Sequence, residues 1–365
     1  MGEVTADKQS APVLTEIPRY RVPSATPTTG LAVAGAGRIP AINVALFLVT
    51  LLTTTMAGAY MAGANLTLDT AADHPVLELA RNLAMGVTFS IPLMTILLCH
   101  EMGHYLTARR NRVSASLPYF LPAPYPSMFI IGTFGAFIRI KSRPASRQQI
   151  FDIGAAGPWA GAIIAVPIVI LGLRLSDIAP LDNSGGLQLG NSLLFWGLSR
   201  WVLGVDPNSV SINLHPVAFA GWLGLFVTAL NLLPVGQLDG GHVIYALFGG
   251  HLHRLISRVF VLGGALTVMA SIALHLSFWG GWLLWAVLLV ALGLGHPSTT
   301  DSTTPLGPSR RIAAWMTIAL FIATFSPVPI SFSPPPPETP DSKAVEVHYV
   351  YPGGRPRMHL PVTRL

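Results

Sequence analysis

The chain has 365 residues, of which 51% are hydrophobic and only 10% are charged. Soluble domains carry about 25% charged residues, so this composition, with a mean hydropathy of +0.56, favours a membrane protein. The net charge is +6, but the basic residues are scattered and flank apolar runs, which argues against nucleic acid as a partner. Because Cys99 is the single cysteine, disulfide frameworks and cysteine-rich zinc sites are excluded.

The two ends of the chain differ in composition from its middle. Residues 1–40 are polar, contain several prolines and lack the apolar core of a signal peptide, so we predict a disordered tail there. Residues 331–365 include four consecutive prolines and predict a second, proline-rich tail. The membrane core is therefore expected over residues 41–330.

Apolar runs within this core predict the fold class. A bilayer-spanning helix needs about 20 apolar residues. We expect an all-α membrane protein, a polytopic bundle of six to seven transmembrane helices, in which Pro92 kinks the second span. A shorter patch, Leu193 to Val205, is interrupted by Arg200 and favours an interfacial helix. The predicted spans cover residues 41–63, 82–106, 154–173, 216–235, 259–276, 278–294 and 312–327.

One segment between the second and third spans has a different pattern. Met128 to Ile140 is β-branched and aromatic, with Gly132 and Gly135 as breaks. This pattern predicts a short membrane-associated β-hairpin or edge strand.

Charges in the loops predict an orientation. Basic residues gather in the N-terminal tail and in the loops after the second and fourth spans, which share one side if the spans alternate. The rule that basic loops stay inside gives an integral membrane protein, expected in a bacterial plasma membrane with its site toward the cytoplasm. The same alternation places the basic C-terminal tail outside, against that rule.

The strongest motif is His100-Glu101-Met102-Gly103-His104 at the end of the second span. On a helix, residues i and i+4 share a face, so the two imidazoles can hold one zinc ion. Zinc activates a water molecule at neutral pH, and Glu101 can take its proton and pass it to the leaving amine. Ionisable groups in a membrane span are costly unless paired, which favours one Zn²⁺ per chain over an ordinary histidine pair at a helix interface.

A catalytic zinc site needs a third protein ligand. The best candidate is Asp239, which follows an uncharged stretch broken by proline and glycine. His242 is a rival ligand, although a supporting role fits it better. Asn231 could donate to the oxyanion formed during peptide hydrolysis, or could make an interhelical hydrogen bond.

These motifs resemble the site-2 protease family of intramembrane metalloproteases. The resemblance covers about residues 80–250 and includes Gly157-Pro158. The segments Gly132–Ile138 and Phe151–Pro158 are similar to the compact branch of the family found in bacteria and plastids. No inserted peptide-binding domain is visible in the sequence. The resemblance implies that His100, His104 and Asp239 hold zinc, that Glu101 is catalytic, and that the substrates are transmembrane segments in the bilayer.

The predicted edge strand then has a physical role. A helical substrate must unwind to expose a peptide bond, and a strand edge offers replacement hydrogen-bond partners. We therefore expect substrate binding at Gly132, Thr133, Phe134 and Gly135, although a buried hairpin with no such role is the plain alternative.

Other readings of the sequence predict different features. A transporter or channel would show repeat halves, which are not found, and gives no reason for the His-Glu-x-x-His spacing. A membrane scaffold with a dead site is disfavoured by the intact Glu101. A different zinc protease fold would use a glutamate as third ligand, but the later glutamates, Glu338 and Glu346, lie in the tail. Cys99 is expected to pack as an apolar residue.

Overall fold

A computed structural model describes residues 40–68, 73–124, 131–180, 186–274, 279–297 and 304–333, together with Gly2, Thr299 and Asp301. The chain divides into two units after Ile39, and all the elements below belong to the unit that starts at Pro40. The helices are α1 (Ala41–Met61), α2 (Pro75–Ala84), α3 (Val87–Arg110), α4 (Arg147–Arg174), α5 (Leu193–Leu203), α6 (Pro216–Asn231), α7 (Asp239–Phe248), α8 (Gly250–Ala273), α9 (Gly281–Leu292) and α10 (Pro308–Thr324). The strands are β1 (Tyr119–Pro122), β2 (Thr133–Phe137), β3 (Asp177–Pro180), β4 (Gly186–Leu189), β5 (Val210–Asn213) and β6 (Ile330–Ser333).

The helical fold class is confirmed, but the number of spans is not. Among the described residues, three helices are long and apolar enough to cross a membrane: α1, α4 and α8. A fourth span results if α2 and α3, which bend by 49° at a short break, are counted together. The predicted count of six to seven transmembrane helices is therefore reduced to three or four by length and composition.

The missing spans are helices that end early. The predicted span over 216–235 becomes α6, which stops at Asn231 because Pro234 and Gly236 follow. The runs over 278–294 and 312–327 become α9, with 12 residues, and α10, with 17. For α6 and α9, the apolar run read from sequence includes turn residues and so overstates the length of the helix, whereas α10 is about as long as its predicted run.

The 49° bend between α2 and α3 lies at Met85 and Gly86, near the start of the second predicted span. Pro92 sits inside α3. A side chain on Gly86 would overlap the backbone carbonyl of Thr55, so only glycine lets this break lie directly against α1. The position of the kink is thus set by a close helix contact that the sequence alone did not reveal.

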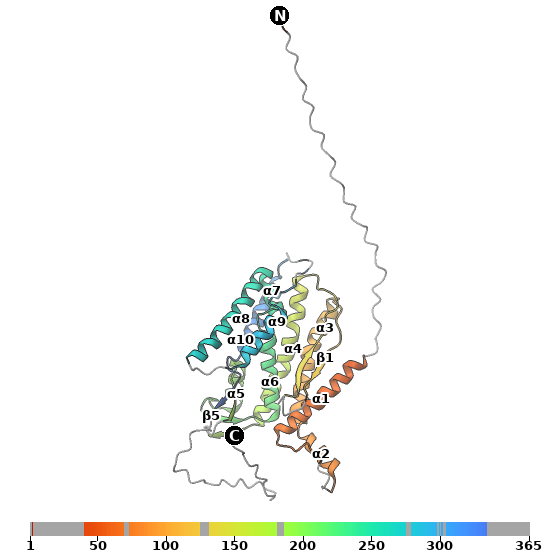
Figure 1. Ribbon diagram of the computed structural model, residues 1–365, viewed down its shortest axis with the longest axis vertical. Coiled ribbons are helices and arrows are strands. Elements are labelled where there is room, and N and C mark those ends of the chain that lie inside the picture. Colours follow the sequence, from red (N-terminus) through yellow and green to blue (C-terminus); the bar gives the residue numbers. More distant parts are fainter. Residues whose placement is uncertain are drawn as a thin grey trace. The chain divides into compact units, whose positions relative to one another are not determined.

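Helix α4 is the central element of the core. It packs against α3, α6 and α7, and α3 in turn packs against α1 (Figure 1). The largest apolar cluster joins Phe89 and Ile96 of α3, Val169 of α4 and Leu225 of α6. At its first turn, α4 is tied to α7 by Arg147, whose guanidinium donates two hydrogen bonds to the carbonyl of Ala246.

Three small antiparallel sheets complete the fold. Strands β1 and β2 form the predicted hairpin, with Phe120 opposite Ala136; the predicted residues 128–130 lie outside the described residues. Asn43 of α1 holds this hairpin by donating to the carbonyls of Leu117 and Pro118. The other two sheets pair β3 with β5 and β4 with β6.

The predicted tails fall largely outside the described residues. Residues 1 and 3–39 are not described, and neither are residues 334–365. The segment predicted as a C-terminal tail nevertheless begins inside a strand, because β6 runs to Ser333 and pairs with β4.

Candidate metal centre

Helix α3 carries the two motif histidines to the centre of the bundle. His100 and His104 lie one turn apart and are both buried, as is Glu101 between them. Gly103 of the same motif packs on the backbone of Ala156, so α3 and α4 approach closely at this level. The i, i+4 geometry expected from the sequence is present.

Asp239, the first residue of α7, completes a three-residue cluster. Its Oδ2 lies 3.3 Å from His100 Nε2 and 3.2 Å from His104 Nε2, and the two nitrogens are 3.1 Å apart. Tetrahedral zinc with bonds of about 2.0–2.1 Å holds its ligand atoms about 3.3 Å apart. The donor set and this triangle of contacts therefore fit a zinc ion; within the described residues, the three form the one candidate metal group found.

The tautomer of His104 also suits a ligand. Its Nδ1 lies 2.7 Å from the carbonyl oxygen of Ile153 in α4. A carbonyl can only accept, so Nδ1 carries the hydrogen and Nε2 keeps the lone pair that a metal requires.

Three glycines on one face of α4 make room for the histidines. Gly154, Gly157 and Gly161 follow one another at intervals of three and four, which places them on one helix face. A Cβ on Gly157 would overlap the ring of His104, and one on Gly161 would lie 3.1 Å from His100 Nδ1. At Gly154 the Cβ would meet that of His242 at 2.7 Å.

Glu101 and Asn231 border the same cavity. The cavity has a volume of about 220 Å³ and is lined by the three clustered residues, Glu101, Asn231 and His242 among others. Within the described part of the chain, the Glu101 carboxylate makes no hydrogen bond, so its oxygens remain available to a water molecule. Asn231 Nδ2 lies 3.3 Å from His100 Nε2, which places the amide beside the cluster.

The hairpin reaches this cavity with different residues from those predicted. Ala136, Phe137, Ile138 and Ile140 line it, whereas Gly132, Thr133, Phe134 and Gly135 do not. Gly132 instead packs on α1, where Thr53 Oγ1 donates to its carbonyl at 2.7 Å. Thr133 is buried and its hydroxyl donates to the carbonyl of Leu121.

A chain of hydrogen bonds orients His242, the rival ligand. Burial lowers the pKa of His242 to about 4 and that of His296 to about 3, so both rings are neutral at neutral pH. His296 Nδ1 donates to the Pro297 carbonyl, and its Nε2 accepts from His242 Nδ1, each at 2.7 Å. Because His242 Nδ1 carries the hydrogen, its Nε2 has none. The ring of Tyr245 stacks on that of His296, with ring centroids 4.0 Å apart.

The model of peptidase family M50 matches residues 88–275, the stretch that contains all three clustered residues and Glu101. The chain belongs to peptidase family M50. The resemblance to the site-2 protease family inferred from the sequence is confirmed.

Curated relatives agree with this membership. The chain is 34% identical over 263 residues to "Probable zinc metalloprotease EGY1, chloroplastic" of Arabidopsis thaliana, a match covering 70% of this chain and 44% of the relative. It is 32% identical to the protein of the same name from Oryza sativa subsp. japonica, over 70% of this chain and 42% of the relative. For "Probable zinc metalloprotease EGY2, chloroplastic" of Oryza sativa subsp. indica, the identity is 29%, over 71% of this chain and 45% of the relative. The chain thus spans under half the length of these relatives, and no solved structure matches it.

The names of the relatives are informative about two predictions, the metal and the membrane in which the protein lies. Together with the His–His–Asp cluster, they support Zn²⁺ as the metal. These names give no support to the predicted bacterial plasma membrane or to its cytoplasmic side, because the relatives are described as chloroplastic. Location in a membrane is supported by the family and by the candidate spans.

Sequence reasoning missed several residues that shape the centre. Ile153 acts through its backbone carbonyl, and no residue type in the sequence indicates such a contact. Gly154 and Gly161 could have been found from their spacing with Gly157, since small residues repeating at three or four mark close helix packing. His296 had one weak signal, a histidine directly after an apolar run.

Proposed function

We propose that this chain is a membrane-embedded zinc metalloprotease that hydrolyses a peptide bond within or beside a transmembrane segment of a protein substrate, in regulated intramembrane proteolysis. The observation that carries the proposal is the convergence of His100, His104 and Asp239 from two helices far apart in sequence. Zinc held there supplies a Lewis acid that polarises the scissile carbonyl and lowers the pKa of a water molecule to about 7.

The chain's own residues supply the proton transfers. Glu101 is buried beside the cluster with its oxygens free of hydrogen bonds in the described structure, so it takes the proton of the attacking water. It then returns this proton to the leaving amine, as a general base that becomes a general acid. The Asn231 amide, directed at the same cluster, donates to the carbonyl oxygen as negative charge develops there.

Substrate binding is proposed at the β1–β2 hairpin. Residues of β2 and those just after it form one wall of the cavity, and Phe137 is partly exposed. An extended substrate segment that adds to this strand exchanges its helical hydrogen bonds for bonds to the strand. Gly135, at a φ of +96°, cannot become proline without reshaping β2, so Gly135→Pro should abolish cleavage while zinc content stays normal. Unchanged cleavage would remove the strand from the proposal.

The test of the catalytic role compares two glutamates. The full chain, purified in detergent and reconstituted in vesicles, is assayed on a panel of single-span reporter segments with helix-destabilising centres. Glu101→Gln should reduce cleavage by on the order of 10²–10⁴-fold with zinc content unchanged. Glu78→Gln makes the same change at an exposed position of α2 and should leave cleavage intact. Full activity of Glu101→Gln would overturn the role of this carboxylate.

Metal dependence is tested on the same preparation. A zinc chelator should stop cleavage, and added Zn²⁺ should restore it. Cleavage that continues in metal-free protein would refute the proposed function as a whole.

A further inference from the structure

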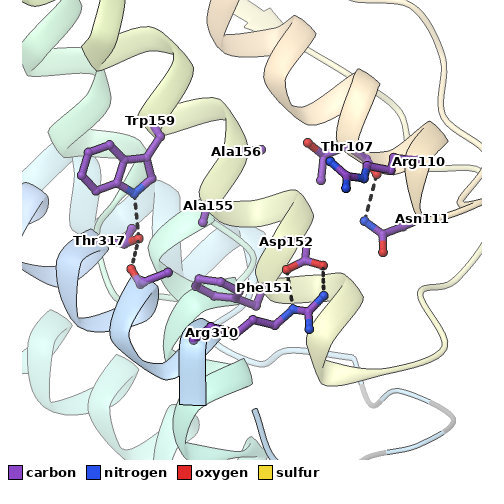
Figure 2. A pocket seen from close by; sticks show the side chains of 12 residues that line it. Thr107, Arg110, Asn111, Phe151, Asp152, Ala155, Ala156, Trp159, Arg310 and Thr317 are labelled. Carbon is purple, nitrogen blue, oxygen red and sulfur yellow. Dashed lines mark hydrogen bonds and ion pairs between the residues drawn. The ribbon is translucent and has the colours of Figure 1, made fainter. Parts of the chain in front are cut away.

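A second cavity lies on the other side of α4 from the metal centre. It is an open groove of about 670 Å³ whose walls come from the end of α3 and the start of α10, with α4 as its floor (Figure 2). The residues of α4 that line it, Phe151, Asp152, Ala155, Ala156 and Trp159, are not those that contact the histidines. The groove is therefore separate from the metal centre.

Two polar contacts fix the α10 wall of this groove. Arg310 makes a bidentate ion pair with Asp152, with both distances 2.8 Å, and Trp159 Nε1 donates to Thr317 Oγ1 at 3.0 Å (Figure 2). The two contacts are seven residues apart on each helix, which is two turns. The wall is thus held to α4 at both ends of the groove.

The mouth of the groove carries an uncompensated positive charge. Asp152 uses both of its oxygens on Arg310 and so neutralises that guanidinium. Arg110, at the last turn of α3, is exposed and has no hydrogen-bond or ion-pair partner among the residues that the structure describes. Ser309, in the first turn of α10 on the other wall, is an exposed polar residue.

The floor of the groove along α4 is largely apolar, whereas Thr107, Asn111 and Thr317 add polar side chains to its walls. From Asp152 to Trp159 its floor extends about 10 Å along α4, at 1.5 Å per residue. Ala155 and Ala156 keep this floor clear of bulky side chains, and Ala313 and Trp159 also line the groove. A free anion would occupy only the mouth, whereas a molecule with an anionic head and an apolar chain matches the whole groove.

We infer that this groove binds one anionic phospholipid, with its phosphate at Arg110 and an acyl chain lying over Ala155, Ala156 and Trp159. Charge complementarity selects the head group, because the mouth has one unpaired guanidinium and no unpaired carboxylate among the described lining residues. The polar mouth lies at the basic end of α3, where a membrane protein meets head groups.

The experiment requires no proteolysis. The full chain is reconstituted in nanodiscs of phosphatidylcholine with or without phosphatidylglycerol, and retained lipid is counted by native mass spectrometry. Wild type should retain one phosphatidylglycerol, with about five-fold lower occupancy in Arg110→Gln, from the usual contribution of one arginine at a membrane surface. Arg109→Gln, the same change at the neighbouring residue that does not line the groove, should behave as wild type.

Two further probes separate a lipid site from an anion site. Inorganic phosphate and glycerol 3-phosphate, added to phosphatidylcholine nanodiscs, should not raise the melting temperature, whereas phosphatidylglycerol should. Stabilisation by either soluble anion equal to that by the lipid would overturn the assignment of the apolar floor. Equal loss of lipid in both arginine variants would mean that the general positive charge of the surface attracts the lipid, and this result would overturn the proposed site.

Discussion

Gly157→Ala is the substitution that most directly tests the packing beneath the metal centre. The added Cβ would overlap Nε2, Cδ2 and Cε1 of His104. Carbon atoms in contact sit about 3.5–4.0 Å apart, so relief of the overlap requires the imidazole to move by more than about 1 Å. Metal sites tolerate bond-length deviations of about 0.2 Å, so the moved ring no longer binds zinc.

The size of the effect follows from the bonds that His104 loses. The ring would leave both the cluster and the Ile153 carbonyl that fixes its tautomer. Loss of an outer partner alone typically weakens metal binding by about 10–100-fold, so loss of the ligand itself should exceed 100-fold. The assay is zinc per chain by mass spectrometry after dialysis against a chelator, together with cleavage of a reporter segment.

Two other glycines provide the controls. Gly263→Ala, inside α8, places a Cβ in open space, and alanine stabilises a helix by about 1 kcal/mol relative to glycine. This variant should therefore stay folded and retain zinc. Gly161→Ala, with its Cβ 3.1 Å from His100 Nδ1, needs a small shift and should weaken zinc binding only in part. Wild-type zinc affinity and cleavage in Gly157→Ala would refute the reasoning.

Three further variants test separate parts of the structure. Asp239→Asn should lower zinc content, because an amide is a poorer metal ligand than a carboxylate. Asp152→Asn, the same change in the ion pair with Arg310 of α10, should leave zinc in place. Equal loss of zinc in both variants would contradict this prediction. His296→Ala should keep zinc but reduce cleavage and cost about 0.5–1.5 kcal/mol of stability in chemical unfolding, since His242 loses its hydrogen-bond partner. Asn43→Ala leaves two carbonyls of the hairpin without their donor and should cost about 1–3 kcal/mol, with reduced cleavage and normal zinc; unchanged cleavage would show that α1 does not position the hairpin.

The site was predictable from sequence because its spacing carries geometry. Two histidines four residues apart define a ligand pair on any helix, and the charge-poor stretch before Asp239 singled out one carboxylate. The partners of these residues were less accessible. A backbone carbonyl such as that of Ile153 leaves no trace in the residue types, and the pairing of His242 with His296 depends on where a distant loop returns.

The spans were harder to predict than the site. Hydropathy measures the length of an apolar run, but a helix ends where its backbone must turn, as α6 does before Pro234. The strand residues show the same limit. The glycines of the hairpin were expected at the substrate because they permit close approach, whereas Gly132 uses that freedom against α1.

The direction of α10 leads to a final prediction about membrane topology. The Asp152–Arg310 and Trp159–Thr317 contacts keep the same order and spacing on both helices, so α10 runs parallel to α4. The pairing of β4, which follows α4, with β6, which follows α10, independently brings the two helix ends together. If α4 crosses the bilayer, α10 should therefore cross in the same direction, and the chain beyond it should emerge opposite to Arg310.

This topology can be measured with single cysteines in a Cys99→Ala background. Ser309→Cys places an exposed thiol in the first turn of α10, and Pro327→Cys places one just after its end. In sealed, oriented vesicles, a membrane-impermeant maleimide should label one of them from outside and the other only after the vesicles are opened. Labelling of both from the same side would mean that α10, at 17 residues, packs on α4 without crossing, and that the basic C-terminal segment stays on the side of the basic loops.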